Sequence, residues 1–196
     1  MLSLVAEPTL AQSLPGHFQF REKRVFVNGT SCTFLSDVTI QGDFVLVAPL
    51  KRDCTNETNE FSSEEGYVFL LNGKDAHSRD CQLAKGDEPV MTCSDGETST
   101  LRGFTANEPL RIDSTISHAS QWTGSRLVLD LNDTETRFTM AGGSGRRAQK
   151  LRKVYHLEFS FAGGQCVIET IKRSRLSNGR NENIVAVKGL GCTIVR

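Results

Sequence analysis

The 196-residue chain lacks a long hydrophobic run, an excess of one charge and a sustained helical pattern. No segment approaches the roughly 18 consecutive apolar residues of a transmembrane helix, so we predict no transmembrane segment. The formal net charge is zero, which gives no overall basic character for binding nucleic acid. Good helix formers gather only in residues 146–153, a length of about two turns. We therefore expect little helix.

Complete motifs for catalysis, nucleotide binding or a structural metal are also missing. Residues 142–146 read Gly-Gly-Ser-Gly-Arg, and the final arginine stands where a G-x-S-x-G nucleophile elbow needs glycine. Four histidines are scattered with no metal-ligand spacing, at His17, His77, His118 and His156. We predict no metal, no cofactor and a non-catalytic protein. A catalytic triad assembled only by the fold stays open as an alternative.

Six cysteines fall along the chain in three pairs, each bracketing an expected strand, turn and returning strand. The pairs are Cys32 and Cys54, Cys81 and Cys93, and Cys166 and Cys192. An even number of cysteines in a strand-rich chain indicates disulfides, and with them a secreted or periplasmic location. Local pairing is one of 15 possible connectivities. A chain of this length can bury a core without cross-links, so we expect each disulfide to brace one hairpin. Free thiols are the alternative.

Apolar residues alternate with polar ones in short runs separated by turn sequences. The turn sequences are Asn28-Gly29, Gln41-Gly42-Asp43, Asn72-Gly73, Asn132-Asp133 and Gly163-Gly164. Asn28-Gly29 indicates a type I′ turn, because both residues tolerate a positive φ. About a dozen short strands with turns every 8–12 residues or so are typical of an antiparallel β-sandwich or β-barrel. A β-trefoil-like arrangement is a further option.

Residues 1–16 are interpreted as a disordered tail or the remnant of a signal peptide, and 17–196 as a single β domain. Two similar halves are one option for that domain, because Val27–Phe34 and Phe161–Ile168 both place a glycine turn before a cysteine. Three stretches are predicted to be loops that carry binding functions. They are residues 51–66, 141–153 and 177–183.

Basic residues concentrate in the second of these loops and form a candidate surface for an anionic partner. They are Arg146, Arg147, Lys150, Arg152 and Lys153. A second basic group follows at Lys172, Arg173, Arg175 and Arg180. We place the two groups at opposite ends of a hairpin, so their convergence is not predicted. A solvated face is the alternative, and nucleic acid is not expected because no aromatic residues are interleaved for base stacking.

Trp122, the single tryptophan, is either a core residue or a platform on which a sugar or ring stacks. Oxygen-bearing side chains cluster at residues 130–135, Asp-Leu-Asn-Asp-Thr-Glu. We interpret this cluster as turn chemistry rather than as a calcium site, since a tight turn rarely presents the six to eight oxygens that calcium needs. Three Asn-x-Thr sequons begin at Asn28, Asn56 and Asn132, where a glycan would lie in a turn or loop.

The sequence thus predicts an extracytoplasmic, disulfide-braced binding or interaction module that is not an enzyme. Its partner is unknown, with an anionic polysaccharide or an acidic protein as options. Three alternatives remain: an inhibitor of a secreted enzyme, a small secreted hydrolase and a barrel that carries a small molecule. A rigid loop flanked by cysteines would favour the inhibitor, a cleft with histidine, carboxylate and serine the hydrolase, and an apolar cavity the carrier.

Overall fold

The structure is a computed structural model that describes residues 14–55, 66–84, 90–100, 109–141, 145–177, 180–181 and 184–195. In these residues the protein is all-β, with two antiparallel sheets and no helix. Sheet A has the strand order β13-β1-β2-β3-β4, and sheet B has the order β12-β11-β10-β9-β8-β5-β6-β7. The strands are β1 His17–Phe26, β2 Ser31–Gln41, β3 Phe44–Cys54, β4 Tyr67–Leu70, β5 Lys74–Ala84, β6 Val90–Cys93, β7 Thr98–Thr100, β8 Pro109–Trp122, β9 Arg126–Ala141, β10 Gly145–Ala162, β11 Gln165–Ser177, β12 Arg180–Asn181 and β13 Ile184–Ile194.

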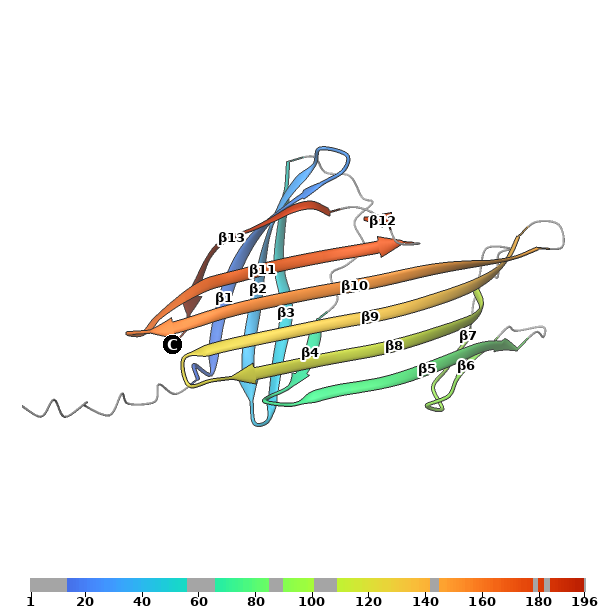
Figure 1. Cartoon of the computed structure of the whole chain (residues 1–196), viewed down its shortest axis with the longest axis horizontal. Helices are drawn as coiled ribbons and strands as arrows, with labels where there is room; N and C mark the ends of the chain where they lie inside the picture. Colours follow the sequence, from blue (N-terminus) through green and yellow to red (C-terminus); the bar gives the residue numbers. More distant parts are fainter. Residues whose placement is uncertain are drawn as a thin grey trace, which may run out of the picture.

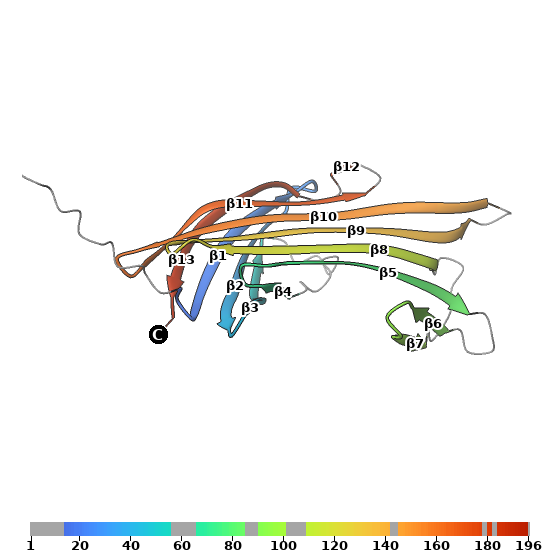
Figure 2. The ribbon, with the colours of Figure 1, turned by 60° about the horizontal axis from the view of Figure 1, so that its bottom comes forward.

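The two sheets pack face to face as a sandwich, but they overlap over only part of sheet B. Figures 1 and 2 show sheet A crossing one end of sheet B, while β5, β8, β9 and β10 continue well beyond it. We call this extension the overhang, defined by residues 109–117 of β8, 132–141 of β9 and 145–154 of β10. The all-β antiparallel fold was predicted correctly, and the sandwich is the form it takes.

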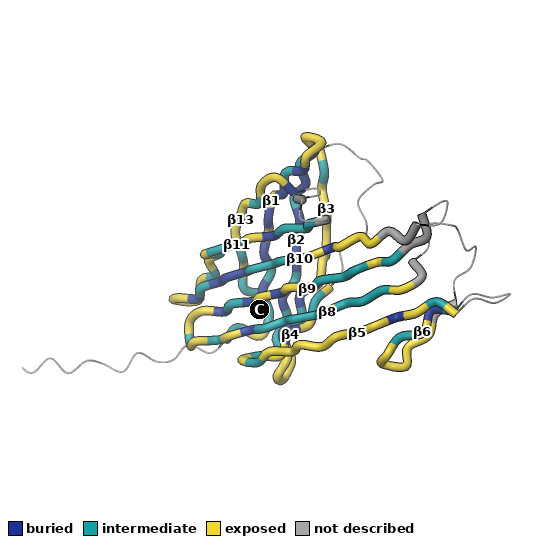
Figure 3. The backbone as a smooth tube through the Cα atoms, turned by 45° about the vertical axis from the view of Figure 1, so that its right-hand side comes forward, coloured by how far each residue is buried: buried dark blue, intermediate teal, exposed yellow. Residues whose placement is uncertain are grey.

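The main apolar core fills the space between the overlapping parts of the sheets, which Figure 3 shows as the buried stretches. It forms because alternate residues of each strand point to the same face. Its fully buried members include Phe18 of β1 and Phe159 of β10, whose ring centroids lie 5.0 Å apart. The buried core residues are Phe18, Phe20, Val38, Val45, Val47, Phe69, Leu127, Leu129, Leu131, Leu157, Phe159 and Phe161.

The long strand β9 replaces a predicted hairpin. Asn132-Asp133 was expected to be a turn, yet both residues lie inside β9 and pair with Val154 and Lys153 of β10. Neither is a glycine, whereas the tight turn of the β10–β11 hairpin has Gly163 and Gly164, both at positive φ. The strands are therefore longer than expected, reaching 18 residues in β10.

The chemistry of the inward-facing residues of β9 changes along the strand. Leu127, Leu129 and Leu131 are at most 1% exposed under sheet A. The same face continues with Asp133, Glu135 and Arg137, all in the overhang. Because alternation holds throughout β9, this switch from leucine to charged residues marks where the cover of sheet A ends. Beyond that cover the inner face of β9 is charged, although Leu151 of β10, opposite Glu135, is still buried.

Two other turns differ in detail from the sequence prediction. In the β1–β2 hairpin the amide of Gly29 donates to the carbonyl of Phe26 at 3.0 Å, and only Gly29 has a positive φ. This is a type I turn followed by a glycine bulge rather than a type I′ turn. Asn72, at a φ of 54°, does not close a hairpin. It lies between β4 and β5, where the chain passes from sheet A to sheet B.

The three disulfides join the cysteines that were paired from the sequence, but they do not all brace hairpins. Cys32–Cys54 links β2 to β3 and Cys81–Cys93 links β5 to β6, in each case between residues directly opposite in the ladder. Cys166–Cys192 instead links β11 of sheet B to β13 of sheet A. The expectation of three local clips is therefore wrong for the third disulfide, which ties the two layers together.

The opposite side of the sandwich is joined by hydrogen bonds from side chains. The hydroxyl of Ser120 on β8 donates to the carbonyl of Leu70 on β4 at 2.8 Å. A ring nitrogen of His118 lies 3.0 Å from the carbonyl of Val68. These contacts satisfy carbonyls at the edge of β4 without a continuous backbone ladder between the sheets. The described strands thus do not close into a barrel.

Candidate functional site

A chain of polar residues crosses between the sheets where the apolar core ends, and we call it the inter-sheet belt. Glu22 of β1 is fully buried and accepts a hydrogen bond from Nε of Arg24 at 3.0 Å. It also accepts one from Nε of Arg173 on β11 at 2.9 Å. Both guanidinium groups are nearly buried, and that of Arg24 lies 3.8 Å from the centre of the Phe34 ring.

The belt continues across sheet B toward β4. The guanidinium of Arg173 lies 4.5 Å from the centre of the Tyr155 ring, and the hydroxyl of Tyr67 donates to that of Tyr155 at 3.3 Å. Sequence reasoning missed these residues, although a signal was present. Glu22 and Arg24 continue the every-second-residue pattern of Phe18 and Phe20 along β1. Their charged side chains therefore point to the same inward face as the two phenylalanines. The contacts assign the belt a structural role, since its groups bind one another.

His118 sits beside the belt and connects it to the overhang. One ring nitrogen contacts the carbonyl of Val68, and Nε2 lies 3.0 Å from Oδ1 of Asp133. Burial by itself lowers the pKa of His118, but the hydrogen bonds to Asp133 and Val68 and the negative charges of Asp133 and Asp75 outweigh it. The pKa of His118 is therefore raised above its ordinary value of 6.5.

The histidines of the described residues are paired with carboxylates rather than with a nucleophile. His17 contacts Asp37 at 2.5 Å, and His156 contacts Asp130 at 2.7 Å. All six cysteines are in disulfides. A Ser-His-Asp system needs the second ring nitrogen next to a serine hydroxyl, whereas Nε2 of His156 lies 3.8 Å from Glu158. This geometry does not favour the hydrolase alternative.

The oxygen-bearing side chains of residues 130–135, expected to lie in a turn, instead lie on β9, which separates them. Asp130 and Asn132 point to the outer face of sheet B, which we define as the face away from sheet A. Asp133 and Glu135 point to the inner face. Because oxygens on opposite faces of a sheet cannot surround one ion, the strand removes the arrangement that a turn would have offered. No cluster of three metal-binding side chains occurs in the described residues.

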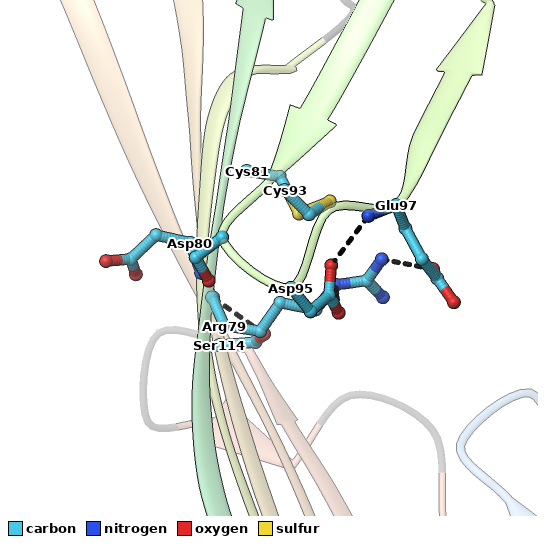
Figure 4. A network of polar contacts seen from close by, with 8 residues as sticks. Arg79, Asp80, Cys81, Cys93, Asp95, Glu97 and Ser114 are labelled. Carbon is cyan, nitrogen blue, oxygen red and sulfur yellow. Dashed lines mark hydrogen bonds and ion pairs between the residues drawn. A yellow bond between two sulfur atoms is a disulfide. The ribbon is translucent and has the colours of Figure 1, made fainter.

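A turn held by several contacts lies at the edge of sheet B that is formed by β5, β6 and β7 (Figure 4). It spans residues 94–97 between β6 and β7 and is held against β5 by the Cys81–Cys93 disulfide. The amide of Ser94 donates to the carbonyl of Asp80 at 2.8 Å, and the amide of Asp80 donates to the Ser94 hydroxyl at 3.1 Å. We call this segment the braced turn.

Arg79 adds a second brace to this turn. Its guanidinium contacts Asp95 at 2.8 Å and also binds Glu97. The carboxylate of Asp95 accepts a hydrogen bond from the amide of Glu97 at 3.1 Å, and the carbonyl of Arg79 accepts one from Ser114 of β8 at 3.0 Å. The braced turn therefore presents an exposed acidic tip on a support that is fixed by covalent and ionic contacts.

The basic residues of 146–153 lie on a strand rather than in the predicted loop. Residues 145–153 are the first part of β10. Alternation places Lys150 and Arg152 on the outer face, while Lys153 points to the inner face. The side chains of Arg146 and Arg147 lie outside the described atoms, as do residues 56–65, 142–144, 178–179 and 182–183. The five basic residues cannot form one patch on the sheet, because Arg152 and Lys153 lie on opposite faces of β10.

The two basic groups do come together, which corrects the expectation that they lie apart. Lys153 of β10 is directly opposite Arg175 of β11 in the ladder, and Lys172 is opposite His156. In an antiparallel hairpin the start of the first strand and the end of the second share one end of the sheet. Placing the groups at opposite ends was therefore a geometrical error.

A shallow depression of about 520 Å³ lies on sheet B beside the β4–β5 corner. Its lining residues are Asn72, Gly73, Ala119, Ser120, Gln121, Trp122, Val128 and Asp130. The backbone amide of Trp122 donates to Oδ1 of Asn72 at 2.6 Å. The Trp122 ring is half-buried and lies 5.8 Å from that of Phe161. Trp122 thus packs against the core and also borders an open, partly polar hollow.

Comparison with known proteins leaves the function to be argued from the structure itself. No family model, no curated protein and no solved structure matches the chain. In the described residues no helix is long and apolar enough to span a membrane. Three intramolecular disulfides are typical of proteins outside the reducing cytosol.

Proposed function

We propose that this chain is a secreted or periplasmic, non-catalytic module that binds a polysaccharide on the outer face of sheet B. The disulfides support the location, since they persist where the surroundings are oxidising. The lack of a cysteine or serine partner for the described histidines supports a binding role rather than a hydrolytic one.

The outer face of the overhang carries the proposal. Alternation places a group of hydroxyl and amide side chains there on β8 and β9, and beside it on the same face of β11. They are Thr115, Ser117, Asn132, Thr134, Thr136 and Ser174. Sugar hydroxyls both donate and accept hydrogen bonds, as do hydroxyl and amide side chains. The same outer face leads along β8 and β9 into the depression beside Trp122.

Affinity chromatography of the disulfide-intact protein on immobilised heparin, alginate, chitin and dextran tests this function. We expect retention on at least one polymer, with the chain length of the free polymer unchanged after long incubation. Substitution Thr134→Tyr should weaken retention by blocking the outer face of β9. Thr33→Tyr on the outer face of sheet A is the matched control. Failure to bind any of the four polymers, or shortening of the polymer, contradicts the proposal.

An inhibitor of a secreted enzyme is the second candidate, and the braced turn is the observation that favours it. Inhibitors gain affinity when the contact loop is held in its bound conformation before it meets the enzyme, and Arg79 with the Cys81–Cys93 disulfide supplies such a constraint. Titration against trypsin, subtilisin, pepsin and lysozyme tests it. Inhibition of one enzyme that is lost in Asp95→Asn would support this function, and full activity of all four enzymes would reject it.

A further inference from the structure

The outer face of the overhang has a charge pattern that specifies which kind of polysaccharide it fits. On β10 the exposed side chains of Lys150 and Arg152 follow one another at alternate positions. Exposed Lys172 lies on β11, opposite His156. We call these three cations the basic strip. It extends from Lys150 to the level of His156, about 20 Å at roughly 3.4 Å per residue.

The strip is bordered by neutral polar residues on β9, while apolar Val154 lies within it and Leu176 of β11 lies opposite Arg152. The outward residues of β9 between Asn132 and Thr136 carry no charge, and neither does Ser174 on β11. Nε of Arg152 donates to Oδ1 of Asn132 at 2.8 Å, which holds the guanidinium across β9. A guanidinium that uses one of its N–H groups for such a contact still has further N–H groups that can donate to an anion. Acidic groups lie near both ends of the strip. Asp113 of β8 is opposite Thr136, the β9 neighbour of Lys150, and is bound to Arg111, while Asp130 and Glu158 lie at and just beyond the level of His156.

We propose that the ligand is a linear polyanionic polysaccharide, lying along β10 with its sulfate or carboxylate groups on Lys150, Arg152 and Lys172. A strip of this length fits a chain of repeating charges better than a single compact anion, because the cations are spread along the strand instead of converging. The face is a hydrogen-bonded sheet, so its cations are held on a regular support. This inference rests on the proposed polysaccharide-binding function and specifies its ligand.

Sheet A offers a second set of three exposed cations, which provides the matched control. Lys23 of β1 lies opposite Lys188 of β13, and Arg21 lies two residues from Lys23 on the same face. This set has the same charge as the basic strip. Its neighbours are Val25 and Leu35, which offer no side-chain hydrogen bonds to a sugar, and Thr33, opposite Lys23, which carries a hydroxyl.

The test measures binding of soluble heparin by the intact protein, by calorimetry, at 50 and 150 mM NaCl. The affinity of the variant K150Q/R152Q/K172Q for heparin is expected to fall by about tenfold or more. Its log affinity should also depend less steeply on log salt, because fewer counterions are released. The control R21Q/K23Q/K188Q should stay within about threefold of the parent protein. Near-UV circular dichroism and the melting temperature establish that both variants are folded.

Each remaining result counts against the inference. Equal weakening by the two triple variants means that net charge, and not the strip, governs binding. Weakening only by the control variant moves the site to sheet A. If the parent protein does not bind heparin but is retained on chitin or dextran, the polyanion inference fails while the polysaccharide-binding function stands. If no polymer is bound at all, the proposed function fails with it.

Discussion

Glu22 and Arg173 are hydrogen-bonded to each other at 2.9 Å although 151 residues separate them in the chain. One belongs to sheet A and the other to sheet B, so their contact exists only when the two layers have docked. The Cys166–Cys192 disulfide joins β11 to β13, and β13 pairs with β1, the strand that carries Glu22. This side of the sandwich is therefore held by both a covalent and an ionic link.

Glu22→Gln should lower the free energy of unfolding by about 3–5 kcal/mol, because it leaves two nearly buried guanidinium groups without their anion. Urea unfolding at neutral pH measures the loss. Arg173→Met is the comparison, since Glu22 then keeps Arg24 and the expected loss is smaller. A larger loss for Arg173→Met than for Glu22→Gln would contradict this account of the belt.

Removing Cys166–Cys192 with paired alanine substitutions should cost about 2–4 kcal/mol of global stability. Its cysteines are 26 residues apart in sequence, and it links the two layers. The cysteines of Cys81–Cys93 are 12 residues apart, and that disulfide joins only β5 and β6 within sheet B. The Cys81→Ala/Cys93→Ala variant should therefore lose less stability, measured by urea unfolding, than the Cys166→Ala/Cys192→Ala variant. If the Cys81→Ala/Cys93→Ala variant is less stable than the Cys166→Ala/Cys192→Ala variant, the link between the layers is not the more important disulfide for stability.

His118 makes the stability depend on pH. Its folded pKa is raised above 6.5, so the stabilisation is fully present below about pH 6.5 and is lost as the pH rises through the folded pKa. Urea unfolding at several pH values should show this loss, and His118→Gln should remove it. The Asp133→Asn substitution removes the negative charge that raises the pKa of His118, while the burial that lowers this pKa remains. The pKa of His118 should therefore fall in this variant. An NMR titration in which Asp133→Asn leaves that pKa unchanged would disprove the assignment.

Two phenylalanines allow the core and the overhang to be compared directly. Phe159→Ala should cost about 3–5 kcal/mol, because its ring is fully buried against Phe18 and Phe20. Phe138 lies in the overhang, half-buried, with Arg111 5.7 Å from its ring centre. Phe138→Ala should cost about 1 kcal/mol or less. Similar losses from chemical denaturation of the two variants would show that the overhang has a core of its own.

The strand content and the two hairpin disulfides could be predicted because both depend on local patterns, whereas Cys166–Cys192 joins two layers whose packing the local pattern does not show. Alternation sets which residues face inward, and Cys81 and Cys93 lie close enough in sequence to meet across one hairpin. The layer to which each strand belongs could not be predicted in this way. Asn72-Gly73 is a turn sequence whether it closes a hairpin or, as here, carries the chain from one sheet to the other.

The candidate site was harder to predict than the fold. The basic residues of 146–153 were found, but their division between two faces required knowing that β10 begins at Gly145. The partners of Glu22 could not be deduced, since Arg173 reaches it only through the packing of the two sheets. The leucine-to-acid change between Leu131 and Asp133 was visible in the sequence, yet it was interpreted as a turn and not as the end of a covered surface.

The overhang gives β9 and β10 a mechanical asymmetry. One half of each strand packs against sheet A, while the other half extends past that cover and pairs with its neighbours in sheet B. Single-layer sheets change their twist at little cost, because no opposing side chains must repack. The half outside the cover can thus adjust its curvature to a partner without disturbing the half packed against sheet A, so a rigid anchor and an adaptable surface are built from the same two strands.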